Sequence, residues 1–100
     1  MARMAITDPS DARQARRKRL LFRARHRGFR EVDLIFGTFA AGALAEMDDA
    51  ELDAFEALLT VPDQEVYAWL QGAPPAPDHD TPVLARMKAL CARTNPTWNA

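Results

Sequence analysis

The side chains best suited to nucleophilic, acid–base or metal chemistry are few and scattered in this chain of 100 residues. It contains a single serine, Ser10, a single cysteine, Cys91, and two histidines, His26 and His79. The two histidines lack metal-ligand spacing, and neither is close to Ser10 in the sequence. Carboxylates are numerous, but no pair lies in a setting that would separate their pKa values. We therefore expect no catalytic residues, no metal site and no enzymatic activity.

Structural roles account for the remaining reactive groups. Cys91 is expected to be a small apolar core residue, because it shares a helical face with Leu84, Met87 and Leu90. A lone cysteine permits no internal disulfide, which favours a reducing compartment. His79 lies in a proline-rich stretch and is expected at the surface.

Charge is strongly segregated along the chain, although the net charge is only −1. Residues 1–30 hold ten Lys or Arg and two Asp, whereas residues 31–80 hold twelve Asp or Glu and no basic residue. Arginine forks suit phosphates, so the basic segment could contact nucleic acid. The simpler interpretation is a solvated helix face, because the sequence has neither a helix-turn-helix signature nor a set of stacking aromatics. We expect a basic end, an acidic body and no nucleic-acid partner.

The stretch RHRGFREVD, Arg25 to Asp33, places one glycine inside an otherwise helical run and surrounds it with charge. Gly28 can end a helix with a left-handed cap, and Glu31 would be stabilised at the start of the next helix. A purely structural interpretation is therefore sufficient for both residues. It does not require an arginine directly before the glycine, and we expect Arg27 and Glu31 to be exposed together on this turn.

Helices must position this turn, because apolar residues recur at helical spacing and no segment alternates as a strand does. The first helix is capped by Ser10 or Asp11, and the second begins at Phe29. The third begins with a capping box, in which Asp48 is the N-cap and Glu51 its reciprocal partner. The predicted core consists of Leu20, Leu21, Ala24, Val32, Ile35, Phe36, Phe39, Ala40, Ala43, Leu52, Phe55, Leu58, Leu59, Val66, Trp69, Leu70, Val83, Leu84, Met87, Leu90 and Cys91.

The second half of the chain continues the helical pattern. A fourth helix has Pro62 at its first position and ends at Gly72, and a fifth is capped by Thr81. The connector APPAPDHD is expected to be extended and exposed. The sequence thus predicts an all-α, single-domain bundle of five short helices over 11–93, a flexible N-terminus over 1–10 and a frayed tail over 94–100. The longest apolar run, Phe39–Ala45, is far shorter than the roughly 20 residues of a membrane span, so no membrane insertion is expected.

The segment Arg27-Gly28-Phe29-Arg30-Glu31 resembles the RGxxE motif of the succinate dehydrogenase assembly factor family. Other segments resemble the same family in the same order: RLLFRARHRG its basic lead-in, VDLIFGTFA its second helix, DDAELDAFEALL its third, and PDQEVYAWL its aspartate-led segment with an aromatic-x-Trp element. The resemblance extends over roughly residues 17–70 and continues weakly through LARMKALCA.

The resemblance implies a five-helix, monomeric protein that is not itself an enzyme. Such a factor binds the flavoprotein subunit of succinate dehydrogenase, or that of fumarate reductase, and promotes covalent attachment of FAD to a histidine of that subunit. It would bind no cofactor stably by itself, and it would act in the bacterial cytoplasm or the mitochondrial matrix. The alternative is an antitoxin-like or nucleic-acid-binding basic helical regulator.

The same resemblance selects the residues expected to contact the partner. Arg27, Gly28 and Glu31 match the motif itself, and Arg30 and Asp33 are its neighbours. The aromatic-x-Trp element corresponds to Tyr67 and Trp69. The spacing of Trp69 places it in the core, so Tyr67 is the expected partner contact of the two.

Overall fold

The structure, a computed structural model, describes the backbone of residues 9–99 and the side chains of residues 11–93. Within that range the chain forms helices and no strand. The α-helices are α1 (Pro9–Arg25), α2 (Arg30–Ala43), α3 (Asp49–Leu59), α4 (Asp63–Leu70) and α5 (Pro82–Asn99), with two short 3₁₀ helices, η2 (Leu44–Glu46) and η3 (Pro77–His79). The all-α prediction is confirmed.

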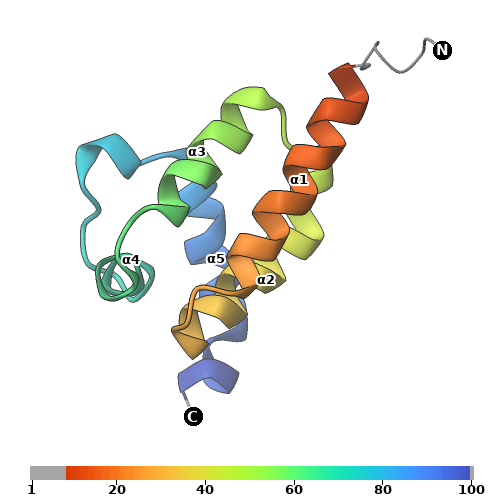
Figure 1. The fold of residues 1–100 in the computed structure, drawn as a ribbon. Coiled ribbons are helices and arrows are strands. Elements are labelled where there is room, and N and C mark those ends of the chain that lie inside the picture. The colour runs from red at the N-terminus through yellow and green to blue at the C-terminus, as the bar shows by residue number, and fades with distance from the viewer. Residues whose placement is uncertain (1–8, 100) are drawn as a thin grey trace, which may run out of the picture.

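The helices pack around one hydrophobic core. Figure 1 shows α1 running along one side of the molecule, α3 beside it and α5 behind them. Helix α1 contacts both α2 and α3, and α5 contacts α2, α3 and α4. Almost all of the predicted core residues are buried, and Leu21 and Leu90 pack against the core as partly buried residues. The sequence pattern missed Leu44, Met47 and Val61, which are buried at the ends of helices.

Local signals fix where several of these helices begin and end. Asp48 accepts a hydrogen bond from the Glu51 N–H at 2.9 Å, and Glu51 accepts one from the Asp48 N–H at 3.0 Å, so the capping box is confirmed. The Thr81 hydroxyl accepts a hydrogen bond from the Leu84 N–H at the start of α5. Gly72 follows α4 with a φ of +119°, which an L side chain rarely adopts.

Some boundaries differ from the sequence predictions. Helix α1 begins at Pro9, before the predicted caps, and Pro62 is the N-cap of α4 rather than its first residue. The backbone of α5 is helical to Asn99, through the segment expected to fray. Residues 1–8, predicted to be flexible, and Ala100 lie outside the described residues.

The connector after α4 is not fully extended, because Pro77–His79 forms the 3₁₀ turn η3. His79, predicted at the surface, is partly exposed and also contacts the core. Its ring is half-buried and lies 5.5 Å from the Trp69 ring, between centroids. Among the described residues, no helix has the length and apolarity needed to cross a membrane.

Basic α1 packs against acidic α3, so much of the charge segregation in the sequence is paired within the protein. Arg16 donates to Asp53 at 2.7 Å and to Glu56 at 2.8 Å, and Arg13 donates to Asp49 at 3.0 Å. The hydrogen bond from Arg16 holds the pKa of Glu56 below its usual range, and the hydrogen bond from Arg13 does the same for the pKa of Asp49. Part of the predicted basic segment is therefore paired with the acidic segment inside the protein.

Candidate functional site

The turn between α1 and α2 is a tight bend with an open outer surface. Gly28 has a φ of +99°, in the left-handed region that glycine enters without steric cost. A Cβ built on Gly28 has no heavy atom within 4 Å. The glycine is therefore required by the backbone conformation, and it leaves the apex of the turn without a side chain.

The carboxylate of Asp33, in the first turn of α2, holds this bend in place. It accepts hydrogen bonds from the backbone N–H of Arg27 at 2.8 Å and from that of Gly28 at 3.3 Å. These two amides lie beyond the end of α1 and would otherwise need water as a partner. Asp33, predicted as a neighbouring partner contact, is thus occupied within the protein by fixing the turn.

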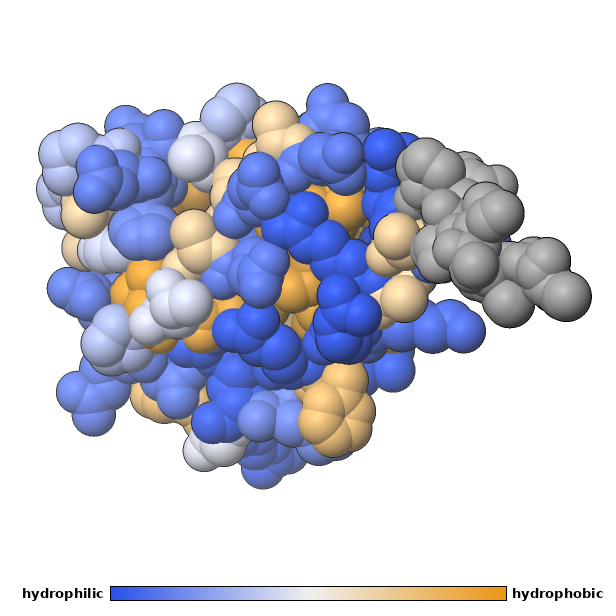
Figure 2. Space-filling view, turned by 45° about the horizontal axis from the view of Figure 1, so that its top comes forward, coloured by the Kyte–Doolittle hydropathy of each residue, from blue (hydrophilic) through white to orange (hydrophobic). Residues whose placement is uncertain are grey.

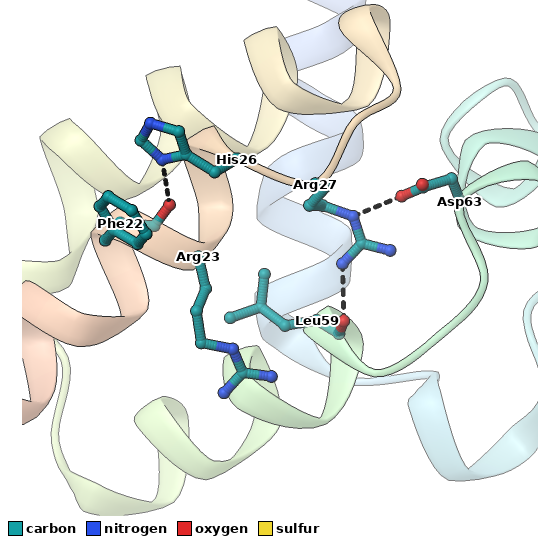
Figure 3. Close-up of a pocket in the computed structure, with 6 residues that line it drawn as sticks. All are labelled: Phe22, Arg23, His26, Arg27, Leu59 and Asp63. Carbon is teal, nitrogen blue, oxygen red and sulfur yellow. Dashed lines mark hydrogen bonds and ion pairs between the residues drawn. The ribbon is translucent and has the colours of Figure 1, made fainter.

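The Arg27 side chain connects the turn to two distant segments (Figure 3). Its guanidinium donates to the carbonyl of Leu59, the last residue of α3, at 2.7 Å. It also donates to the carbonyl of Val61 at 2.5 Å. It also forms an ion pair with Asp63 in the first turn of α4. The guanidinium carbon lies 5.0 Å from the centre of the Phe36 ring, within range of a cation–π contact.

The exposure expected for Arg27 is therefore wrong, because its side chain is only 8% exposed. Helix α3 has no basic residue in its last turn, and Arg27 supplies the positive charge that its carboxyl end favours. Arg27 therefore links the end of α1 to the end of α3 and to the start of α4.

The side chains of Arg30 and Glu31 are both exposed, as predicted for Glu31. Within the described part of the chain, neither has a hydrogen bond or ion pair with another side chain. The turn therefore presents one cationic and one anionic group beside the bare backbone of Gly28. Tyr67 is half-buried on α4, and its ring centre lies 5.3 Å from that of Phe29, so it supports the turn from the interior side.

An exposed aromatic residue beside the turn was missed by the sequence pattern. Phe22 is 63% exposed, and its ring stacks on His26 with 4.0 Å between centroids. The two residues, together with Arg27, Leu59 and Asp63, line an open pocket of about 290 Å³ (Figure 3). The available signal was that Phe22 lies off the apolar stripe formed by the neighbouring α1 residues.

The site has the features of a surface for recognition. In the part of the chain that the structure describes, no cluster of three or more His, Cys, Asp or Glu could hold a metal ion. The surface view in Figure 2 shows mostly hydrophilic residues, with apolar residues visible in gaps between them. Charged groups around an uncovered backbone, with one exposed ring nearby, form a surface that a protein partner could contact.

Comparison with known proteins identifies the family. Residues 18–91 match the model of the family described as flavinator of succinate dehydrogenase, so this chain belongs to that family. The matched region contains the whole turn, the residues that Arg27 bonds and the pocket lined by Phe22.

Named relatives support the same assignment. The chain is 45% identical over 74 residues to FAD assembly factor SdhE of Acetobacter pasteurianus, covering 73% of this chain and 68% of the relative. It is 41% identical over 68 residues to mitochondrial succinate dehydrogenase assembly factor 2 of Mycosarcoma maydis, covering 68% of this chain and 29% of the relative. The factor of the same name in Cryptococcus neoformans is 39% identical over 74 residues, and 42% of its length is covered. The chain thus spans less than half of these two mitochondrial proteins. No solved structure matches it significantly.

Proposed function

We propose that this protein binds the flavoprotein subunit of succinate dehydrogenase and promotes covalent attachment of FAD to that subunit. The observation that carries the proposal is the turn at Gly28, which has an open apex and a conformation fixed by Asp33 and Arg27. Family membership and the names of the relatives indicate which partner such a surface serves.

The proposed mode of action is binding, with the chemistry supplied by the client. A factor that binds one conformation of a client more tightly than the others increases the population of that conformation. A turn that is already rigid loses little conformational entropy when it docks, which favours binding at a small interface. We propose that Gly28 allows close backbone approach, and that Arg30 and Glu31 make charged contacts. Arg27 contributes by holding the turn.

Three further features belong to the same proposal. The protein acts as a monomer, it holds no flavin stably by itself, and the flavoprotein subunit of fumarate reductase is a second client. Binding to nucleic acid is not favoured, because Arg13, Arg16 and Arg23 all pair with carboxylates of α3. Their positive charge is largely neutralised where phosphates would have to bind.

The test is to produce the flavoprotein subunit with and without this protein and to read covalent flavin fluorescence in a denaturing gel. Glu31→Gln is expected to reduce the signal, because it removes an exposed carboxylate at the turn. Glu65→Gln is the matched control, because Glu65 is an exposed carboxylate in the first turn of α4. Flavin attachment that is the same with and without the protein would refute the proposed function.

A further inference from the structure

A second hollow surface adjoins the turn along the outer side of α1 and α2. Two open hollows of about 410 and 170 Å³ lie there and share Ala41 in their linings. The larger one begins at the turn, where it is lined by Asp33, Arg25 and Leu34. We call the combined surface the α1/α2 groove, lined by Lys18 and Arg25 on α1, by Leu34, Thr38 and Ala41 on α2, and by Ala45 on η2.

A glycine of α2 lets α1 pack closely beside the groove. Gly37 is buried, and a Cβ built on it would lie 3.0 Å from Cγ of Arg25. The aliphatic part of Arg25 therefore lies directly over the backbone of α2. Arg25 is exposed and lines the larger hollow, so its charged group is accessible to a partner there.

The basic residues of α1 and of the turn after it differ in their partners. Arg13, Arg16, Arg23 and Arg27 form ion pairs with α3 or α4. By contrast, Lys18 and Arg25 line the groove, and no carboxylate among the described residues lies within ion-pair distance of either. The groove therefore has positive charge that the protein does not neutralise, which favours an acidic partner.

The groove also contains an apolar anchor. Among the described residues, only Phe22 and Leu34 are large hydrophobic residues that are exposed, at 63% and 46%. Phe22 lies in the pocket lined by Arg27, and Leu34 lies beside Asp33, so both are close to the turn. Together with the turn, these two exposed side chains provide apolar area that a partner can bury.

We infer that the α1/α2 groove is a second contact surface for the same client, and that it binds a segment of the flavoprotein subunit carrying an acidic residue next to an apolar one. The carboxylate pairs with Arg25 and Lys18, and the apolar side chain packs on Leu34. This inference rests on the proposed function, because the groove is continuous with the turn proposed to bind that subunit.

The test measures the affinity of the purified flavoprotein subunit for variants of the full chain, by biolayer interferometry. Arg25→Glu and Leu34→Asp are each expected to weaken binding about tenfold or more, as at interface residues of this kind. Arg25→Lys keeps the charge and should bind within about threefold of the wild type. Arg19→Glu makes the same charge change at an exposed position of α1 outside the groove, and it should change the affinity less than about twofold.

Each outcome separates the inference from the proposed function. Suppose that the wild type increases covalent flavin and that Glu31→Gln lowers it. If Arg25→Glu and Leu34→Asp then bind the subunit as tightly as the wild type, the groove inference is overturned and the proposed function stands. The groove inference is also overturned if Leu34→Asp changes only self-association in sedimentation, or only binding to phosphatidylglycerol vesicles. If the wild type neither binds the subunit nor increases covalent flavin, the proposed function fails. Circular dichroism confirms beforehand that each variant is folded.

Discussion

The role assigned to Arg27 predicts a large loss of stability when its guanidinium is removed. Arg27→Met keeps most of the apolar stem but removes the guanidinium over Phe36, and it leaves Asp63 and the carbonyls of Leu59 and Val61 without their donor. Removing one partner of a buried ion pair typically costs about 3–5 kcal/mol. Asp63 is 27% exposed and water can reach it, so we expect the lower end, about 3 kcal/mol.

That loss is a large part of the roughly 5–15 kcal/mol that stabilises a typical domain. Urea unfolding followed by far-ultraviolet circular dichroism measures it as a lower midpoint at an unchanged slope. Arg27→Lys keeps the charge but lacks the fork, so it should lie between the wild type and Arg27→Met. Arg19→Met is the control, because Arg19 is exposed and should change stability by less than about 0.5 kcal/mol. A loss below about 1 kcal/mol for Arg27→Met would refute the structural role, because it is less than a buried pair should cost.

Three further predictions concern stability and reactivity. Gly42→Ala should raise the free energy of unfolding by about 0.5 kcal/mol, because a Cβ at this helical position meets nothing within 4 Å, whereas Gly28→Ala should lower it because of its positive φ. The hydrogen bond from Arg16 lowers the pKa of Glu56 in the folded protein. The Glu56 carboxylate therefore stabilises the fold fully above the pKa of an unfolded glutamate, and this stabilisation is lost as the pH falls through the pKa of Glu56 in the folded state. Urea titrations between about pH 6 and 3 should show this loss, and Arg16→Gln should make it smaller. Burial raises the pKa of the Cys91 thiol, so iodoacetamide should label it much more slowly in the folded protein than in urea; equal rates would contradict its burial.

Local signals in the sequence predicted most of the fold. The capping box of α3 involves residues three positions apart, and the buried face of α2 follows from helical periodicity, so both could be predicted from short windows. The turn at Gly28 was predicted for the same reason. The start of α1 was not, because its first turn carries more than one residue that can serve as a cap.

The direction of the Arg27 side chain could not be predicted from such windows. Its partners Leu59, Val61 and Asp63 lie 32 to 36 residues further along the chain, and their positions depend on how α3 and α4 pack. One indirect signal was present, because residues 31–80 contain no Lys or Arg. Neither α2 nor α3 has a basic residue in its last turn, so the positive charge favoured there comes from another segment of the chain.

The same reasoning applies at the end of α2, where Arg17 of α1 donates to the carbonyls of Leu44 and Met47 at 2.7 and 2.8 Å. Charge segregation in the sequence thus reflects contacts of α1 and the Gly28 turn with acidic side chains of α3 and α4 and with the carboxyl ends of α2 and α3. The sequence predicts two surfaces of opposite charge, because a linear sequence does not show which charged side chains will pair in the fold.

Photo-cross-linking tests most directly whether the surface around the Gly28 turn contacts the client. Phe22 is replaced by p-benzoylphenylalanine, which keeps an aromatic ring in the pocket beside the turn, and Ala92, exposed on α5, is replaced in the same way as the control. The predicted result after irradiation with the flavoprotein subunit is a covalent adduct from position 22 and none from position 92. An adduct from position 92 alone, from a protein that still increases covalent flavin, would contradict the proposed binding surface.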